Sequence, residues 1–282
     1  MRHSPPQTVA ESPLAATRRA ATDPPEKETE KMTDSRGFEN RVAFVTGAGN
    51  GIGREMARDV VRQGGKVAIA DIDLAAAEAA AAELGDAAMA VLCDVADERS
   101  VQTAVDTAAE ELGGIDVLVN NAGLHLMKWN VPVTSVTAEQ WHQILGVNVV
   151  GVVNCARSAR PYLARGKSPA ILNLSSIAGY LSNTVYGITK LGVRGLTVAL
   201  AEEFAPDGIR VNAVAPGAIG SDNAIGELSG QLRVLIDDMQ LIHRMGTMAD
   251  IVNAMNYLCT DAAGMVTGQT LSVSGGYPLH LS

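Results

Sequence analysis

From residue 42 onward, short apolar runs alternate with longer segments in which apolar residues recur at helical spacing. The runs that predict strands lie at residues 42–46, 66–70, 88–92, 116–119, 170–174, 209–214 and 270–273. The segments that predict helices lie at residues 52–62, 73–84, 98–112, 137–163 and 186–204. Strands alternating with helices of this length are typical of a parallel sheet covered on both faces. The pattern therefore predicts a single doubly wound α/β domain of about seven strands.

The first 36 residues have a different character. They are rich in proline and charge, and their scattered apolar residues follow no period. Such a segment buries too little apolar surface to offset its conformational entropy, so we predict a disordered extension at 1–36 and a folded domain at 37–282. No apolar stretch follows Arg18 and Arg19, which argues against a secretory signal. We hypothesise that translation starts at Met32. N-terminal sequencing that finds residues upstream of Met32 in the native protein would contradict this.

Composition narrows the function classes. The 282 residues carry a formal charge of -9 and are 47% hydrophobic, which provides for a large core and argues against a nucleic-acid surface. No apolar run approaches the ~18 residues needed to cross a bilayer. Cys93, Cys155 and Cys259 are widely spaced and form no cluster with histidine, so neither a disulfide framework nor a zinc site is indicated. We expect a cytoplasmic protein without metal, nucleic-acid or membrane partners.

The first predicted strand runs into a turn that holds Gly47, Gly49, Gly51 and Gly53, and a predicted helix follows. The N-terminus of a helix presents unpaired N–H groups and a positive dipole end to a pyrophosphate, and glycine lets the phosphates approach. Asp71 ends the next strand about 20 residues further on, where a dinucleotide fold places a carboxylate on the adenosine ribose. No Lys or Arg lies among residues 48–50 to receive a 2′-phosphate, so NAD is favoured over NADP.

Tyr186 and Lys190 are four residues apart at the start of a predicted helix, so their side chains share a face. A nearby ammonium lowers the pKa of a phenol from its usual value of roughly 10, which suits Tyr186 to general acid or base work. The hydroxyl of Ser176, just after a predicted strand, could bond a substrate oxygen. A Tyr–Lys pair at this spacing also occurs by chance on many surface helices, so the glycine turn is needed to support this interpretation.

Together these motifs resemble the short-chain dehydrogenase/reductase family. Residues 46–53 match TGxxxGIG, residues 120–123 match NNAG, residues 186–190 match YxxxK, and Pro216 with Gly217 match its PG segment. The resemblance spans about residues 41–276 and implies a Rossmann-like fold. It implies that Tyr186 is the general acid/base, that Lys190 tunes it and binds the nicotinamide ribose, that Ser176 orients the reacting oxygen, and that Asn148 holds a water linked to Lys190.

The resemblance also implies a set of cofactor contacts. Asp71 would bind the adenosine ribose, Asp94 and Val95 the adenine, and Ile219 and Ser221 the nicotinamide amide and the phosphates. The full set comprises Gly47, Asn50, Gly51, Ile52, Gly53, Asp71, Asp94, Val95, Asn121, Ala122, Gly123, Tyr186, Lys190, Pro216, Gly217, Ile219 and Ser221.

One departure from the family concerns the loop before Tyr186. Ser176 precedes Tyr186 by ten positions, fewer than is common in the family. A tighter loop could move the serine or open the substrate pocket, so Ser175 is the alternative source of the catalytic hydroxyl.

The resulting hypothesis is an NAD-dependent oxidoreductase that interconverts a secondary alcohol and a ketone. An NAD(H)-binding sensor or scaffold and an NADP-preferring ketoreductase stay open as alternatives. Residues 220–244 are the expected lid, with an apolar stripe from Leu228 to Leu241, and 124–129 with Tyr180 and Leu181 are expected to border an apolar substrate pocket. In the family the helices at 137–163 and 186–204 form a dimer interface within tetramers, whereas the sequence alone also allows a monomer core.

Overall fold

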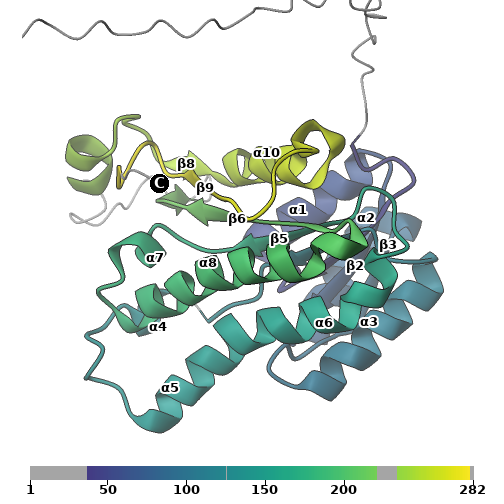
Figure 1. Ribbon diagram of the computed structural model, residues 1–282, viewed down its shortest axis with the longest axis horizontal. Helices are drawn as coiled ribbons and strands as arrows, with labels where there is room; N and C mark the ends of the chain where they lie inside the picture. The colour runs from purple at the N-terminus through teal and green to yellow at the C-terminus, as the bar shows by residue number, and fades with distance from the viewer. Residues whose placement is uncertain (1–36, 125, 221–233, 280–282) are drawn as a thin grey trace, which may run out of the picture. The chain divides into compact units, whose positions relative to one another are not determined.

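Short strands of valine, alanine, isoleucine and leucine form the centre of the domain in the computed structural model (Figure 1). The structure describes residues 37–124, 126–220 and 234–279, so the predicted disorder at 1–36 and the predicted contact Ser221 lie outside it. Within these residues seven parallel strands form one sheet in the order β3-β2-β1-β4-β5-β6-β9. They are β1 (Val42–Thr46), β2 (Lys66–Asp71), β3 (Ala88–Leu92), β4 (Val117–Asn120), β5 (Ala170–Leu174), β6 (Arg210–Pro216) and β9 (Thr270–Val273). A separate pair is β7 (Ile219–Gly220) with β8 (Gly246–Thr247).

Helices cover both faces of the sheet, which makes the fold doubly wound and Rossmann-like (Figure 1). One face carries α1 (Gly51–Arg62), α2 (Leu74–Leu84) and α10 (Met248–Cys259). The other carries α3 (Glu98–Leu112), α6 (Gly151–Leu163) and α8 (Val185–Phe204). Shorter helices are α4 (Leu126–Trp129), α5 (Ala138–Leu145) and α7 (Ala178–Leu181). The predicted fold class is therefore confirmed.

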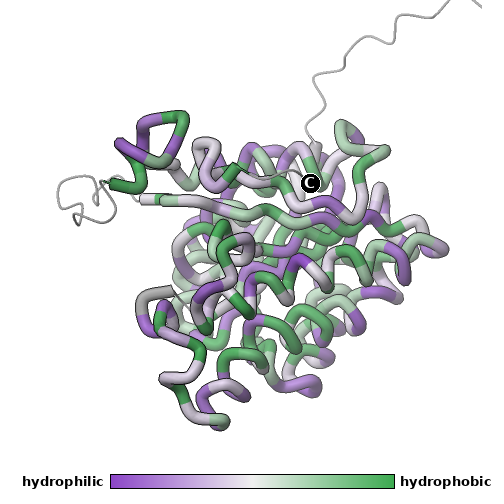
Figure 2. The backbone as a smooth tube through the Cα atoms, turned by 60° about the vertical axis from the view of Figure 1, so that its left-hand side comes forward, coloured by the Kyte–Doolittle hydropathy of each residue, from purple (hydrophilic) through white to green (hydrophobic). Residues whose placement is uncertain are grey.

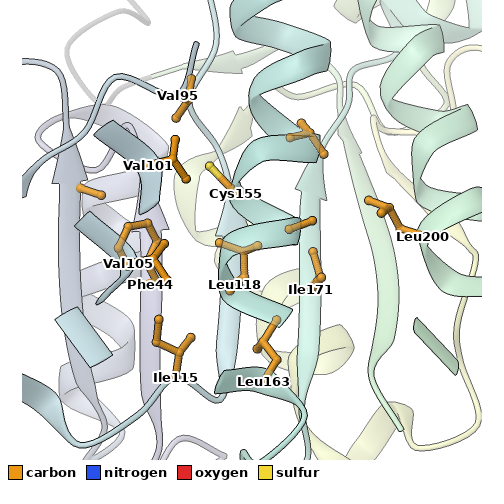
Figure 3. Close-up of a cluster of buried hydrophobic side chains, with 14 of the residues drawn as sticks. Phe44, Val95, Val101, Val105, Ile115, Leu118, Cys155, Leu163, Ile171 and Leu200 are labelled. Atoms are coloured by element: carbon orange, nitrogen blue, oxygen red, sulfur yellow. The ribbon is translucent and has the colours of Figure 1, made fainter. Parts of the chain in front are cut away.

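Successive residues of each strand enter different cores. Phe44 packs toward α3 and α6, whereas its neighbours Ala43 and Val45 pack toward α1 and α10, because side chains alternate along a strand. Figure 3 shows side chains of β1, β4 and β5 meeting those of the helices in the first core. Burial on both sides explains why the central strands read as continuous apolar runs. Figure 2 shows the helices alternating between hydrophilic and hydrophobic stretches.

Two differences from the predicted elements concern long helices. The predicted helix at 137–163 is continuous in space, but residues Gly146–Val150 form a π-turn between α5 and α6, in which the N–H of Gly151 donates to the carbonyl of Gly146. Helix α10 was not predicted. Its start does carry a sequence signal, because Thr247 and Asp250 form a capping box there.

The sheet order reverses between β1 and β4. Ligands of open α/β sheets bind beyond the carboxyl ends of the strands at such a switch point. The glycine turn follows β1, Asn121 follows β4, and Ser176 follows β5, so these sequence-predicted residues lie at one edge of the sheet.

Candidate active site

The turn after β1 has a backbone that only glycine allows without strain. Gly47 and Gly51 have φ angles of +61° and +57°, in the left-handed region. A Cβ at Gly53 would lie 2.5 Å from the carbonyl oxygen of Gly47 and 2.5 Å from the side-chain nitrogen of Asn121. A Cβ at Gly51 would meet nothing within 4 Å. The turn thus packs tightly against Gly47 and Asn121 at Gly53, whereas no atom of the described residues lies beside Gly51.

The N-terminus of α1 has no side-chain cap, which distinguishes it from five other helices that begin in a loop. The side chain of its N-cap residue Asn50 makes no capping bond, and the first turn contains no acidic residue. By contrast a side chain caps each of α2, α3, α5, α8 and α10. Unpaired N–H groups at a positive dipole end suit a pyrophosphate. The residues of this turn therefore fit a dinucleotide.

Asp71, the last residue of β2, lies against this turn. Its Oδ2 accepts a hydrogen bond of 2.9 Å from the N–H of Gly49, and its Oδ1 accepts one of 3.0 Å from the N–H of Asp73. Each carboxylate oxygen retains further lone pairs. The carboxylate is thus fixed at the edge of the glycine turn, where the sequence predicts a group that binds the adenosine ribose.

Asn121 joins the loop after β4 to the glycine turn. Its side-chain nitrogen donates to the carbonyls of Thr46 and Gly47, both at 2.9 Å. The hydroxyl of Thr46 accepts from the backbone N–H groups of Asn121 and Ala122. The side chains of Asn121 and Thr46 therefore both hold the glycine turn against the loop after β4. The sequence motifs did not indicate this role for Thr46.

The two residues expected near the adenine differ in setting. Asp94 closes a local turn, since its Oδ1 accepts from the N–H of Ala96 at 2.9 Å. The side chain of Val95 is 7% exposed and packs into the core against Gly151. The carbonyl of Val95 accepts from Asn154. The side chain of Val95 therefore packs in the core, whereas Asp94 lies in the turn after β3.

Ser176, Tyr186 and Lys190 converge beyond the end of β5. Thr184 caps α8 by accepting from the N–H of Gly187, which starts the helix just before Tyr186. Ser176 acts on the phenol of Tyr186, because burial raises the Tyr186 pKa and hydrogen bonding from the side chain of Ser176 opposes this larger effect. The ammonium of Lys190 lies 5.6 Å from the centre of the Tyr186 ring and donates to the carbonyl of Leu174 at 2.6 Å. The structure therefore brings these three predicted residues together.

Ser175, the alternative hydroxyl, points elsewhere. Its side chain is 3% exposed and donates to the carbonyl of Lys190 at 2.9 Å. The short loop to Tyr186 is accommodated because α7 lies directly on α8: a Cβ at Gly179 would lie only 2.7 Å from the carbonyl carbon of Lys190. The ten-position spacing thus still places Ser176, and not Ser175, on the phenol.

The expected lowering of the Tyr186 pKa by Lys190 is wrong for this structure. Burial raises the pKa of Tyr186 to about 12, and the hydrogen bond from Ser176 opposes this only in part. Burial also lowers the pKa of Lys190 to about 8. Both shifts have one physical cause, because removing water disfavours the phenolate and the ammonium alike. Lys190 is not among the causes of the shift in the Tyr186 pKa, and its ammonium donates to the carbonyl of Leu174.

Asn148 lies in the π-turn, with 1% of its surface exposed. Its Oδ1 accepts from the N–H of Leu124 at 2.7 Å, and its Nδ2 donates to the hydroxyl of Thr189 at 3.1 Å. A Cβ on Gly123 would be 3.4 Å from this Oδ1 and 3.6 Å from the ammonium of Lys190. Asn148 and Lys190 therefore both border Gly123. Thr189 was not singled out from the sequence.

The PG segment contacts the same region. The carbonyl of Pro216 accepts from the N–H of Ile177, next to Ser176, at 3.0 Å. A Cβ at Gly217 would lie 2.8 Å from the Cα of Ser274, so only glycine fits there. Ile219 packs against the core that contains α10. The segment thus ties β6 to the loop that carries the serine.

The expected substrate pocket is only partly described. Trp129 is 2% exposed and forms a small core with Ile144 and Val185, to which Leu124 and Tyr186 add. It is therefore a packing residue, although it was expected at the pocket border. Residues 221–233 of the expected lid lie outside the description, and in its described part Met239 and Leu241 are 42% and 64% exposed. The predicted apolar stripe is not continuous there.

A cavity of about 610 Å³ lies away from this site. It lies at the opposite end of the sheet, near the start of β1 and β2, and basic residues such as Lys66 and Arg165 line it. The helices α3 and α6 end there, and cations commonly compensate the negative dipole ends of helices. The convergence of Ser176, Tyr186 and Lys190 is the stronger indicator of chemistry, because it combines buried titratable groups with a hydroxyl partner.

Within residues 37–124, 126–220 and 234–279, no cluster of His, Cys, Asp and Glu has the composition of a metal site. None of the helices seen in those ranges is both long and apolar enough to span a membrane.

Known proteins share this architecture. A family model described as enoyl-(acyl carrier protein) reductase matches residues 47–278. The cis-4-hydroxycyclohexanecarboxylate dehydrogenase of Sinomonas cyclohexanicum is 38% identical over 245 residues, which cover 85% of this chain and 97% of that protein. The 3-oxoacyl-(acyl-carrier-protein) reductase FabG of Staphylococcus aureus is 38% identical over 253 residues, 87% of this chain and 98% of that protein. A solved short-chain alcohol dehydrogenase structure from Sinorhizobium meliloti has a TM-score of 0.77 at 33% identity and covers 88% of this chain and 100% of its own.

The fold and the site together define an oxidoreductase that uses a nicotinamide cofactor. The chain belongs to the short-chain dehydrogenase/reductase family and is an NAD(P)-dependent enzyme acting on a small molecule.

Proposed function

We propose that this enzyme reversibly oxidises a secondary alcohol to a ketone with NAD, and that Tyr186 transfers the hydroxyl proton. The observation that carries the proposal is the convergence of Ser176, Tyr186 and the buried ammonium of Lys190 at the carboxyl end of β5. The names of two relatives point the same way, because one is a dehydrogenase of a hydroxy compound and the other reduces an oxo group.

Each residue has a role in this proposal. Ser176 holds the reacting oxygen, and Tyr186 removes its proton in oxidation and returns it in reduction. Because burial raises the pKa of the phenol, the phenolate needs a positive neighbour, and we assign that task during turnover to Lys190. Lys190 also binds the nicotinamide ribose, and Asn148 holds a water linked to it. The bound nicotinamide supplies the acceptor for the carbinol hydride.

The glycine turn and its neighbours would hold the dinucleotide. In this proposal the turn from Gly47 to Gly53 binds the pyrophosphate, Asp71 the adenosine ribose, and Asp94 with the backbone of Val95 the adenine. The remaining contacts are those of the loop after β4 and the PG segment. They comprise Asn121, Ala122, Gly123, Pro216, Gly217, Ile219 and Ser221.

We expect wild-type protein to bind NAD at least about tenfold more tightly than NADP, because the carboxylate of Asp71 would repel a 2′-phosphate. Asp71→Ala should weaken NAD binding and reduce the difference in affinity between NAD and NADP. Dissociation constants measured by calorimetry for both dinucleotides test this. Asp73→Ala is the matched control, since its carboxylate caps α2 and should leave the NAD/NADP ratio unchanged. Tighter NADP binding by the wild type would favour an NADP-preferring ketoreductase.

The substrate class is tested by turnover. Because Leu124 and Val131 pack against the same small apolar core as Tyr186, we propose an apolar secondary alcohol or ketone. Secondary alcohols are screened with NAD by following the absorbance of the reduced cofactor. Binding of NAD without turnover of any of them would indicate the alternative, an NAD(H) sensor or scaffold.

The two serines give a paired prediction. Ser176→Ala should lower kcat on the order of 10²-fold, because it removes a donor to the reacting oxygen. Ser175→Ala removes a bond to the carbonyl of Lys190 and should lower kcat far less. Steady-state kinetics of both variants with one alcohol measures the difference. Full activity of Ser176→Ala with loss in Ser175→Ala would reverse the assignment.

We further propose that the enzyme forms a dimer or tetramer through α6 and α8. Val150, in the π-turn just before α6, is 48% exposed, and Leu191 and Val198 on α8 are 43% and 57% exposed, although each is a large apolar residue. Such a surface commonly marks an interface. Light scattering that gives a monomer mass at micromolar concentration would contradict this.

A further inference from the structure

Thr189 lies between Tyr186 and Lys190 on α8 and is completely buried. Its hydroxyl donates to the carbonyl of Tyr186 at 2.8 Å and accepts from the side-chain nitrogen of Asn148 at 3.1 Å. It therefore links the helix that carries the Tyr–Lys pair to the π-turn between α5 and α6.

The side chain of Asn148 can take only one orientation here. The N–H of Leu124 is a donor, so the atom of the Asn148 amide facing it at 2.7 Å must be the oxygen. The amide nitrogen then needs acceptors on its other side. Thr189 provides the shorter contact, 3.1 Å, against 3.4 Å to the carbonyl of Leu124. Because Asn148 is 1% exposed, solvent does not readily replace this acceptor.

A shift of this amide would reach the proposed catalytic groups. Its oxygen and the ammonium of Lys190 both border Gly123, at 3.4 Å and 3.6 Å from the position of a Cβ there. Rotation of Asn148 would also release the N–H of Leu124 and loosen the loop after β4.

We infer that Thr189 is a positioning residue, which fixes the amide of Asn148 and through it the surroundings of Lys190. This inference rests on the function proposed above. Thr189 itself has no contact with the reacting atoms in this proposal, and its effect on turnover passes through Asn148.

The chain contains a matched control on the same helix. Thr197 is also completely buried, and its hydroxyl donates to the carbonyl of Val193 at 2.8 Å and accepts from the side-chain nitrogen of Asn173 at 3.0 Å. The oxygen of Asn173 is held by another donor, the side chain of Asn120. Thr197 thus repeats the hydrogen bonding of Thr189 without contacting Asn148 or Lys190.

The experiment compares Thr189→Val, Thr189→Ser and Thr197→Val. Valine keeps the shape but removes the hydroxyl, so an amide hydrogen loses its acceptor in either Val variant, and Tm should fall in both. Only Thr189→Val should lower kcat, by about 10- to 100-fold, because small displacements of catalytic groups have effects of this size. Its dissociation constant for NAD should change much less than kcat, because the glycine turn and Asp71 are untouched. Thr189→Ser should keep wild-type kcat.

Two further measurements keep the inference testable. If Thr189→Val does not fold, Thr189→Cys replaces it, since a thiol suits a buried site but accepts weakly, and kcat should rank Ser above Cys. In a double-mutant cycle, the Tm changes of Thr189→Val and Asn148→Ala should not add, because the two residues share one bond.

The outcomes separate this inference from the proposed function. If the wild type turns over an alcohol and Tyr186→Phe does not, the function stands. Four results would then overturn the role of Thr189 alone. They are an unchanged kcat in Thr189→Val, a fall in the kcat of Thr197→Val equal to that of Thr189→Val, and a kcat of Thr189→Ser below the wild type or no higher than that of Thr189→Cys. The fourth is that the Tm changes of Thr189→Val and Asn148→Ala add.

Discussion

Tyr186→Phe is expected to lower kcat for alcohol oxidation on the order of 10²–10⁴-fold, because it removes the group that accepts the hydroxyl proton. The ring itself is retained, so its packing against Ile144 and Val185 should persist. The dissociation constant for NAD should change little, since the glycine turn and Asp71 are untouched. Steady-state kinetics with calorimetry of cofactor binding measures both quantities.

Tyr162→Phe is the matched control for this experiment. Tyr162 lies on α6 at the opposite end of the sheet, and its hydroxyl donates to the carboxylate of Asp106 at 2.7 Å. The same chemical change there should leave kcat within about twofold, because general acid–base catalysis depends on the position of the group. Normal turnover in Tyr186→Phe would defeat the proposed mechanism.

Lys190→Met is expected to change how stability depends on pH. Burial lowers the pKa of Lys190 to about 8 in the folded protein, whereas an unfolded lysine has a pKa of about 10.4. Between these values the unfolded chain binds more protons than the folded one, so the free energy of unfolding of the wild type rises with pH. The slope for one such group approaches about 1.4 kcal/mol per pH unit. Methionine removes this contribution.

Denaturant unfolding of both proteins between pH 7 and 10 measures this difference. The wild type should gain stability relative to Lys190→Met across the window from pH 8 to 10. A constant offset, such as the lost bond to the carbonyl of Leu174, does not alter the slope. Tyr186 is present in both proteins, and its effect on stability begins only near the unfolded pKa of about 10, at the top of this range. Parallel curves would show that Lys190 does not lose its proton early in the folded state.

The fold was largely readable from the chain because its signals are local. Apolar runs of strand length alternate with helix-length segments, and this alternation admits few arrangements. Helix α10 was missed, although Thr247 and Asp250 form a capping box at its start. The π-turn around Asn148 could not be read from helical spacing, because five residues of π-helix inside a longer helix leave the apolar pattern almost unchanged.

The candidate site was predictable where motifs are contiguous. The glycine turn and the Tyr186–Lys190 spacing follow from residue types and short intervals. The choice between Ser175 and Ser176 could not be made from residue types, because it depends on how closely α7 approaches α8 at Gly179. The expected effect of Lys190 on the phenol also failed, because burial and the direction of the ammonium are tertiary properties.

The sequence by itself determined the class of fold, the order of the strands along the chain and the residue types available for hydride and proton chemistry. Tertiary structure alone decided which hydroxyl meets the phenol, how far burial shifts the pKa values of Tyr186 and Lys190, and which side chain holds Asn148. The physical reason is that periodicity and turn chemistry act over a few neighbouring residues, whereas solvation and hydrogen-bond partners depend on segments far apart in the chain.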